Sequence, residues 1–228
     1  MSVHSITNPE CQAYFTSLCA EESDVQRSLK ALVATLDKVP PMYIDALQGA
    51  ILAFLARSIQ AKHILELGTF VGYGTLWLSR ALLPDGKITT CEIDKRWWPI
   101  ARDAFEKAGV SDHIIQEKQA ALLSLKAWNS LESPPQFDFI FVDADKSNSP
   151  LYFEHCLKLL SPHGLLIMDN VWWQGKLLDE NYSQRRAQVL RKFNSDLAQD
   201  PRIDLVMLPI SDGMSLIRKR SKLALDSP

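Results

Sequence analysis

The sequence predicts an α/β fold built on a parallel, doubly wound sheet. From residue 63 onward, apolar runs of strand length alternate with helix-like segments, and glycine or proline marks the junctions between them. Strands and helices that alternate at this spacing form right-handed βαβ units, which place strands side by side in parallel. Five strand-like runs belong to this part: Ile64–Leu67, Ile88–Ile93, His113–Glu117, Phe137–Val142 and Leu165–Met168.

The segments between and after these runs carry apolar residues at helical spacing. Two further strand-like runs close the chain, Ile203–Ile210 and Met214–Arg220, and Ser211-Asp212-Gly213 joins them. This tight Asp-Gly link predicts a hairpin, and hence an antiparallel strand at the end of the parallel sheet. The expected helices of this region are Leu76–Leu83, Trp97–Ala108, Ala121–Leu131, Tyr152–Leu160 and Gln184–Ala198.

Residues 1–60 look helical and show no strand-like alternation. We expect helices at Glu10–Ala20, Asp24–Leu36 and Asp45–Ile59, which cap a pocket, form an oligomer interface, or do both. The whole chain, 1–228, is expected to form a single domain, with this helical region at 1–60 and the sheet-bearing core at 61–220.

Composition is that of an ordinary globular protein, with 46% hydrophobic and 23% charged residues among 228 and a formal net charge of −2. That balance gives no electrostatic reason to expect nucleic acid or an anionic membrane as a partner. The first fifteen residues lack the pattern of a secretory signal, and no apolar run approaches the roughly 20 residues that span a bilayer. The four cysteines form no CxxC pair. We expect a cytoplasmic protein with reduced thiols.

The stretch His63–Ser79 has the form of a nucleotide pocket. An apolar run that contains Glu66 leads into a turn with Gly68, Gly72 and Gly74, and a helix-like run comes after it. In α/β sheets, such a unit holds a nucleotide at the carboxyl end of the first strand. The spacing is not GxGxxG, so taken alone it also fits a tight turn without a ligand.

A second acidic residue narrows the choice of ligand. Glu92 lies near the end of the run Ile88–Ile93, where an acidic side chain takes the ribose hydroxyls in such sheets. Because Glu66 lies on the adjacent strand and the glycine turn has no basic residue, a pyrophosphate ligand is disfavoured. S-adenosylmethionine, with its sulfonium and amino group, fits this site better than NAD does.

Acidic residues also come directly after two later strands. Asp143 ends the apolar strand in FVDADKS, and Asp169-Asn170 ends the next one in GLLIMDN. Since parallel strands end at the same edge of a sheet, these side chains should meet and offer an all-oxygen set for a hard divalent cation. A helix N-cap or turn would explain either strand end alone, whereas the pair favours a cation. Such a set does not distinguish Mg²⁺ from Mn²⁺ or Ca²⁺.

Lys146 is the one cation close to this cluster in the sequence. It either neutralises Asp143 or Asp145, or it takes a proton from a substrate hydroxyl and steadies the oxyanion. Trp172 and Trp173 come directly after the second acidic cluster. They either wall a substrate pocket or pack in the core.

With these residues in view, the chain resembles the class I S-adenosylmethionine-dependent O-methyltransferases. More narrowly, it is similar to the cation-dependent group that includes caffeoyl-CoA and catechol O-methyltransferases and their small bacterial relatives. The resemblance runs from about Gln12 to Arg220 and is carried by ILELGTFVGYGTLWLS, GKITTCEID, FDFIFVDADK, GLLIMDNVWWQGK, LRKFNSDLAQDPR and LPISDGMSLIRK. It implies a Rossmann-like fold with a seven-stranded, mostly parallel sheet, and a homodimer.

The resemblance also implies roles for individual residues. The cofactor-binding residues would be Met42, Ile44, Glu66, Gly68, Thr69, Gly72, Gly74, Glu92, Ile93, Ala121 and Asp143. The catalytic residues would be Lys146 and Asp143, the metal ligands Asp143, Asp169 and Asn170, and the substrate-side residues Asp145, Trp173 and Gln174. Two positions depart from the family pattern: Gly74, where serine is frequent, and Gln119, where glycine is usual.

Together these features predict methyl transfer from S-adenosylmethionine, with a divalent cation (Mg²⁺ first), to a hydroxyl of a small catechol-like phenol. Two alternatives stay open at this point. An NAD-dependent oxidoreductase on a similar sheet is disfavoured by the absent GxGxxG. A non-catalytic ligand-binding scaffold of the same fold is disfavoured because the acidic set and Lys146 occur together. The physiological acceptor cannot be identified from the sequence.

Overall fold

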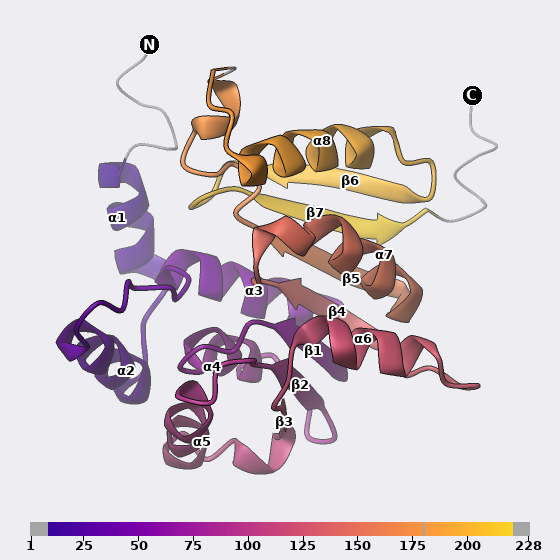
Figure 1. Ribbon diagram of the computed structural model, residues 1–228. Helices are drawn as coiled ribbons and strands as arrows, with labels where there is room; N and C mark the ends of the chain where they lie inside the picture. Colours follow the sequence, from indigo (N-terminus) through magenta and orange to yellow (C-terminus); the bar gives the residue numbers. More distant parts are fainter. Residues whose placement is uncertain (1–8, 180, 221–228) are drawn as a thin grey trace.

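A computed structural model describes residues 9–179 and 181–220, and its centre is one seven-stranded sheet (Figure 1). The spatial order of the strands is β3-β2-β1-β4-β5-β7-β6. The order reverses between β1 and β4, and ligands of such sheets bind in the crevice at the carboxyl ends of the two strands where this happens. The strands are β1 (His63–Leu67), β2 (Lys87–Cys91), β3 (Ile114–Glu117), β4 (Phe137–Val142), β5 (Leu160–Asp169), β6 (Ile203–Leu208) and β7 (Met214–Lys219).

Strand pairing confirms the predicted α/β fold with a doubly wound, mostly parallel sheet. The strands β1 to β5 pair in parallel, whereas β7 lies between β5 and β6 and is antiparallel to both. Leu67 of β1 lies opposite Val142 of β4, and Val142 lies opposite Met168 of β5. The next residues along β4 and β5, Asp143 and Asp169, therefore meet at the same edge of the sheet.

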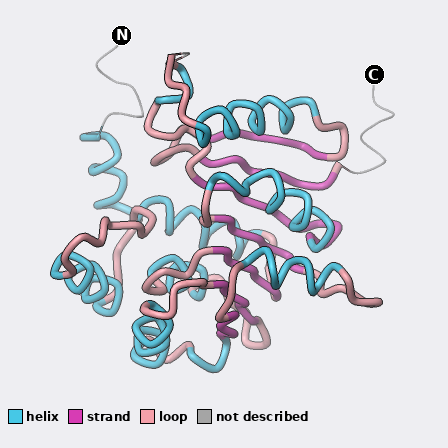
Figure 2. The backbone as a smooth tube through the Cα atoms, in the orientation of Figure 1, coloured by secondary structure: helices cyan, strands magenta, loops and turns pink. Residues whose placement is uncertain are grey.

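Helices cover both faces of the sheet (Figures 1 and 2). Helices α2 to α5 contribute to the core on one face, and α6 to α8 to the core on the other. Three short 3₁₀ turns complete the described part: η1 (Ser111–His113), η2 (Lys146–Asn148) and η3 (Lys176–Leu178). The helices are α1 (Pro9–Cys19), α2 (Asp24–Thr35), α3 (Ala46–Ser58), α4 (Tyr73–Ser79), α5 (Trp97–Lys107), α6 (Ala121–Asn129), α7 (Ser149–Leu159) and α8 (Arg185–Gln199).

Most element bounds lie close to the predicted ones, and two differences bear on the site. Helix α4 begins at Tyr73 rather than at Leu76, because Gly72 takes a left-handed conformation (φ 87°) and starts the helix at once. Strand β2 ends at Cys91, so Glu92 lies just beyond the strand rather than inside it. No helix of the described residues is long and apolar enough to cross a membrane. The expectation about a signal sequence partly concerns residues 1–8, which lie outside the described residues.

The alternation of side chains in β1 carries one charged group into the interior. Ile64 faces the core beneath α3 and α4, whereas Leu65 and Leu67 face the core beneath α6 and α7. Glu66 shares the face of Ile64, since strand side chains alternate with a period of two. It is only 1% exposed, so its carboxyl group needs partners within the protein.

The turn after β1 depends on glycine at one position. Gly68 has a φ of 105°, which side-chain-bearing residues rarely adopt, and a Cβ placed there would collide with the backbone oxygen of Asp143. The amide of Asp143 donates to the oxygen of Leu67 at 2.8 Å. The ends of β1 and β4 therefore approach more closely than any residue with a side chain at position 68 would allow.

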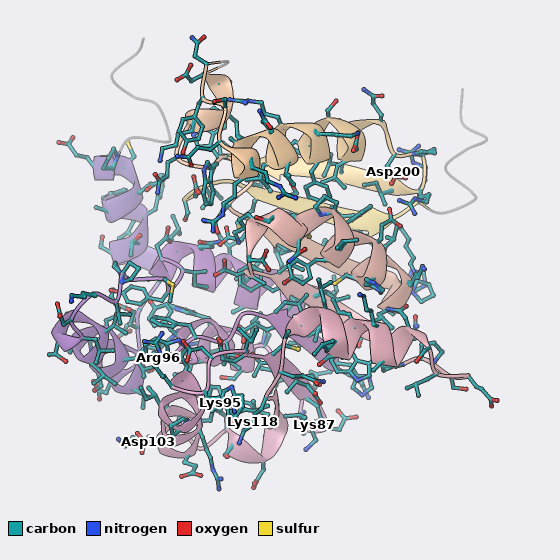
Figure 3. The ribbon with its side chains drawn as sticks, in the orientation of Figure 1. Lys87, Lys95, Arg96, Asp103, Lys118 and Asp200 are labelled. Atoms are coloured by element: carbon teal, nitrogen blue, oxygen red, sulfur yellow. The ribbon has the colours of Figure 1, made fainter. Side chains whose placement is uncertain are left out.

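At the opposite end of the molecule, an ion-pair network fastens the start of β6. Arg202 pairs with Glu154 of α7 and with Asp200, each at 2.6 Å. Figure 3 shows Asp200 just past the end of α8, far from the glycine turn. The hairpin β6–β7 is thus anchored to α7 at the end remote from the site.

Candidate active site

A cleft opens where β1 and β4 end, at the reversal of strand order. The segment at 42–44, which precedes α3, lines this cleft together with residues of the glycine turn. The lining residues are Met42, Tyr43, Ile44, Glu66, Gly68, Thr69, Phe70, Tyr73, Gly74, Phe141 and Asp143. Seven of the residues proposed for the cofactor belong to this lining: Met42, Ile44, Glu66, Gly68, Thr69, Gly74 and Asp143.

Two hydroxyl groups hold Glu66 at the base of this cleft. Thr75 and Thr90 donate to Oε2 of Glu66 at 2.5 and 2.6 Å, and Thr90 also contacts the hydroxyl of Thr69 at 2.6 Å. Burial raises the pKa of Glu66 to about 8, and the two hydroxyl groups only partly oppose that rise. A cationic ligand group near this carboxyl would favour its charged form. The geometry therefore suits a ligand that carries positive charge.

The conformation of Glu66 also explains why position 74 is a glycine here. A Cβ on Gly74 would lie 2.7 Å from Oε1 of Glu66. A serine at this position would require the carboxyl group to move. Glycine at position 74, where serine is frequent in the family, therefore leaves room for the Glu66 carboxyl group in the position in which Thr75 and Thr90 hold it.

Glu92 fastens the glycine turn from the neighbouring strand end. Its Oε2 accepts from the amide of Phe70, and its Oε1 from the amide of Asp94, both at 2.7 Å. It does not belong to the lining of the cleft. Its acidic side chain nevertheless lies beyond β2, next to the glycine turn.

Three other residues proposed for the cofactor lie outside the lining. Gly72 faces α5, where a Cβ would meet Phe105, so its glycine is explained by packing and by its positive φ. Ile93 is 68% exposed. Ala121 is the first residue of α6, which follows the edge strand β3 in the chain.

The second cluster begins with an ion pair at the end of β4. The Nζ of Lys146 donates to Oδ1 of Asp143 at 2.9 Å, and the Lys146 side chain is only 9% exposed. Asp143 also lines the cleft, so it belongs to both clusters. Of the two interpretations of Lys146, the structure shows the contact with Asp143, which is compatible with either.

Asp169 is buried at the end of β5 and receives two neutral donors. The side-chain amide of Gln48 donates to its Oδ1 at 2.7 Å, and the backbone amide of Asn170 at 2.8 Å. Burial, together with the nearby Asp143 carboxylate, raises the pKa of Asp169 well above its usual range, and Lys146 opposes this. Two carboxylates that repel each other in buried surroundings are a setting in which a cation is favourable.

The donor chemistry at this edge fits a hard cation. Within residues 9–179 and 181–220, no three His, Cys, Asp or Glu side chains gather as a metal-binding group. The available set is instead two carboxylates, Asp143 and Asp169, and the side-chain amide of Asn170, whose backbone has a φ of 56°. Such a set needs water or substrate oxygens to complete it, as Mg²⁺ sites commonly do.

The substrate-side residues lie in two different settings. Asp145 is exposed and caps η2, and its carboxyl accepts from the amide of Asn148 at 3.2 Å and from the hydroxyl of Tyr152 at 2.7 Å. Trp173 and Gln174 both have positive φ values in the loop after β5. The structure therefore gives Asp145 a structural task, whereas the other two lie in the loop that follows Asn170.

The loop after β5 is held at both ends by residues that the sequence analysis did not identify. Asp212 of the β6–β7 turn accepts from the amide of Gln174. Arg191 of α8 donates to the carbonyl oxygens of Leu177 at 2.9 Å and of Tyr182 at 3.1 Å, and also to those of Lys176 and Asp179. One guanidinium group thus organises the loop beyond the tryptophan pair.

Gln48 is the other functional candidate that the sequence analysis missed. It lies in the first turn of α3, three residues after the N-cap Asp45, and this pattern signals only a helix start. Its contact with Asp169 joins positions 121 residues apart. No local pattern indicates such a contact.

Comparison with known proteins identifies the family. A family model described as O-methyltransferase matches residues 16–220. The chain belongs to the O-methyltransferase family. This confirms the resemblance seen in the sequence and the predicted enzyme class, and it does not favour the oxidoreductase or the non-catalytic scaffold.

Individual relatives cover nearly the whole chain. Catechol O-methyltransferase domain-containing protein 1 of Mus musculus is 36% identical over 212 residues, which are 93% of this chain and 80% of the mouse protein. The catechol O-methyltransferase of Niastella koreensis is 34% identical over 208 residues, 89% of this chain and 93% of its own. The O-methyltransferase TomG of Streptomyces achromogenes, solved in complex with SAM, superposes with a TM-score of 0.85 at 31% identity, covering 97% of this chain and all of TomG.

The raised pKa of Glu66 predicts a pH dependence of stability in the cofactor-free protein. Between pH 4.5 and about 8 the folded protein holds a proton on Glu66 that the unfolded chain has released. The free energy of unfolding should therefore fall as pH rises through this window, by at most about 1.4 kcal/mol per unit for one group. Glu66→Gln should remove this contribution and gain stability over the wild type toward pH 8.

Urea denaturation at several pH values between 5 and 8 measures the effect. Glu106→Gln, at an exposed position of α5, is the matched control and should follow the wild-type curve. If Glu66→Gln keeps the wild-type slope, the buried acid does not titrate in this range.

Proposed function

We propose that this protein is an S-adenosylmethionine-dependent and divalent-cation-dependent O-methyltransferase that methylates a hydroxyl of a catechol-like phenol. The observation that carries the proposal is that one residue, Asp143, belongs both to the cleft around Glu66 and to the oxygen-rich edge with Asp169. The names of the relatives support the substrate class, and TomG, solved with SAM, supports the cofactor.

The cleft supplies the groups that S-adenosylmethionine needs, a cofactor that carries its methyl group on a sulfonium. Glu66 would bind the ammonium group at the methionine end of the cofactor. This positive charge would offset the free-energy cost of burying the ionised Glu66 carboxylate. The segment at 42–44 would close over the ligand, and Gly68 would allow the backbone to approach it. Glu92 would take the ribose hydroxyls, with Ala121 beside the adenine.

Asp143, Asp169 and Asn170 would hold the cation, with Mg²⁺ first and Mn²⁺ or Ca²⁺ as alternatives. When bound, the cation supplies the positive charge that draws two vicinal hydroxyl oxygens to this edge and lowers their pKa. Asp143 would fix the position of the cation relative to the cofactor, because it belongs to both the cleft and the cation site.

Lys146 is assigned to the acceptor hydroxyl: as a neutral amine its Nζ would take the hydroxyl proton, and the ammonium so formed would stabilise the oxyanion. Its Nζ is fixed by Asp143 at the edge where the acceptor oxygen would develop negative charge. That oxygen then forms a bond to the methyl carbon as the carbon–sulfur bond breaks. The electron pair of that bond stays on sulfur, so S-adenosylhomocysteine leaves as the uncharged thioether.

The acceptor would lie against the loop after β5. The buried indole N–H of Trp173 has no hydrogen-bond partner among the described residues, and a polar group of the substrate would satisfy it. Gln174 is the next residue of the same loop, and Asp145 is the third residue proposed for this side. Of the two interpretations of Trp173, we therefore propose the pocket wall.

We also propose a homodimer in the cytoplasm. Helix α1 contacts α3 but buries none of its own residues, and it exposes Tyr14 and Leu18 by more than 60%. Phe54 of α3 is 72% exposed, so the two adjacent helices present apolar surface that a second copy of the chain would cover. All four cysteines are unpaired, which suits a reducing compartment.

Removal of divalent cations should abolish activity. Methyl transfer from isotope-labelled S-adenosylmethionine to a panel of vicinal diphenols, measured by mass spectrometry, should lose its product signal in EDTA and recover it with Mg²⁺ or Mn²⁺. Asp169→Ala should be inactive in both conditions while it still binds S-adenosylhomocysteine. Full activity of the EDTA-treated enzyme and of Asp169→Ala would contradict the cation-dependent mechanism.

Lys146→Met should lower kcat by about 10²- to 10⁴-fold, the range for loss of a group that handles a proton in the transition state. The Kd for S-adenosylhomocysteine should stay unchanged, because Lys146 does not line the cleft. Lys158→Met, on the exposed side of α7, is the control and should retain wild-type turnover. Wild-type kcat in Lys146→Met would leave Lys146 with only the task of neutralising Asp143.

Phe54→Asp should convert the dimer into a monomer, measured by light scattering coupled to size-exclusion chromatography. A charge in the centre of an apolar interface is costly to bury. Leu151→Asp, which replaces an exposed leucine of α7 instead, should remain dimeric. A monomeric wild type, or a Phe54→Asp variant that still dimerises, would show that this surface is not the interface.

A further inference from the structure

A buried hydrogen bond with no role assigned so far joins the first turn of α3 to the edge of the sheet. Gln48 is 2% exposed, and its amide donates to Oδ1 of Asp169 at 2.7 Å. We infer that Gln48 is a positioning residue for the cation site: it holds the Asp169 carboxylate in the orientation in which the cation binds. This inference rests on the proposed function, and specifically on cation binding at this edge.

The position of Gln48 is itself fixed. Asp45 caps α3 by accepting from the backbone amide of Gln48 at 2.7 Å, and it also accepts from the hydroxyl of Ser211 in the β6–β7 turn. The backbone of Gln48 is therefore held by the helix cap while its side chain reaches Asp169. A side chain with this little freedom can fix the orientation of its partner.

The two donors on Asp169 act on one oxygen only. Gln48 and the amide of Asn170 both donate to Oδ1, and no other hydrogen bond to the Asp169 side chain occurs within the described residues. Two donors on one oxygen restrict rotation of the carboxyl group and leave Oδ2 for a cation. Second-layer hydrogen bonds of this kind commonly orient metal ligands.

The chemical type of the donor matters as much as its place. Lys146 holds Asp143 through a positive charge, which cancels part of the field that attracts a cation. Gln48 holds Asp169 through a neutral amide, which orients the carboxylate and leaves its charge intact. A lysine or arginine at position 48 would bring a positive charge next to Asp169 and would repel the cation.

The chain also offers a matched control. Gln26 occupies the corresponding place in α2, where it is the third residue after the N-cap Ser23 and is fully buried. Its side chain donates to the backbone oxygen of Tyr73 at 3.5 Å and touches neither Asp143 nor Asp169. Gln26 also closes the capping box of α2 with Ser23 and accepts from Arg80. Gln26→Met therefore removes a buried amide from the same helix position, and tests the effect of destabilisation away from the acidic edge.

The experiment measures Mn²⁺ binding to the full chain by electron paramagnetic resonance, without substrate. Gln48→Met should raise the Kd for Mn²⁺ by about 10- to 100-fold, as expected for loss of a group that orients a ligand. The Kd for S-adenosylhomocysteine, from calorimetry of the metal-free protein, should be unchanged. Gln26→Met should leave the Kd for Mn²⁺ at the wild-type value.

The outcomes separate this inference from the proposed function. If the wild type does not bind Mn²⁺, cation dependence fails and the inference fails with it. If the wild type binds Mn²⁺ and Gln48→Met binds it equally well, only the inference is overturned. If Gln48→Met does not fold, Gln48→Asn replaces it, because asparagine keeps the amide but is one methylene too short to reach Asp169. Weaker Mn²⁺ binding by Gln48→Asn would support the inference, and wild-type binding would overturn it.

Discussion

The structure depends on one electrostatic constraint, the convergence of three carboxyl groups at the ends of neighbouring strands. Glu66 and Asp169 are almost completely buried, and Asp143 follows directly after β4, the strand between β1 and β5. Burial and repulsion by Asp143 raise the pKa of both buried acids. Such an arrangement is unfavourable for a protein without ligands, so each acid needs a specific partner.

The fold supplies those partners from different layers and in different chemical forms. Hydroxyl groups of Thr75 and Thr90 hold Glu66, an amide from α3 holds Asp169, and the ammonium of Lys146 holds the carboxylate shared by both clusters. The two outer acids therefore keep a carboxyl group that a cationic ligand would ionise, whereas Asp143 is already paired with an ammonium group. This division fits the proposed site, in which a cationic cofactor binds on one side and a divalent cation on the other.

Local regularity in the sequence was enough to predict the sheet and its acidic edge, whereas contacts made by tertiary packing were missed. Alternation of strands and helices placed Asp143 beside Asp169, because parallel strands end at a common edge. The sequence did not predict the hydrogen-bond partner of Asp169, because Gln48 is 121 residues away in the chain and its helix shows only the pattern of an N-cap. Arg191 lies inside a predicted helix whose pattern does not indicate that its guanidinium group reaches a neighbouring loop. The glycine at position 74 is explained only by the conformation of Glu66.

The way the acids are held also relates stability to ligand binding. A carboxyl group whose pKa is raised by burial destabilises the folded state when it ionises, and a ligand that restores its charged form with a counter-charge removes that cost. Two such acids lie at this edge, and the stretch at 42–48 links their surroundings: residues 42–44 line the cleft that Glu66 also lines, and Gln48 donates to Asp169. The N-terminal helices are therefore more than a cover for the sheet, because the segment that leads into α3 connects the cleft around Glu66 to Asp169, where the proposed cation would bind.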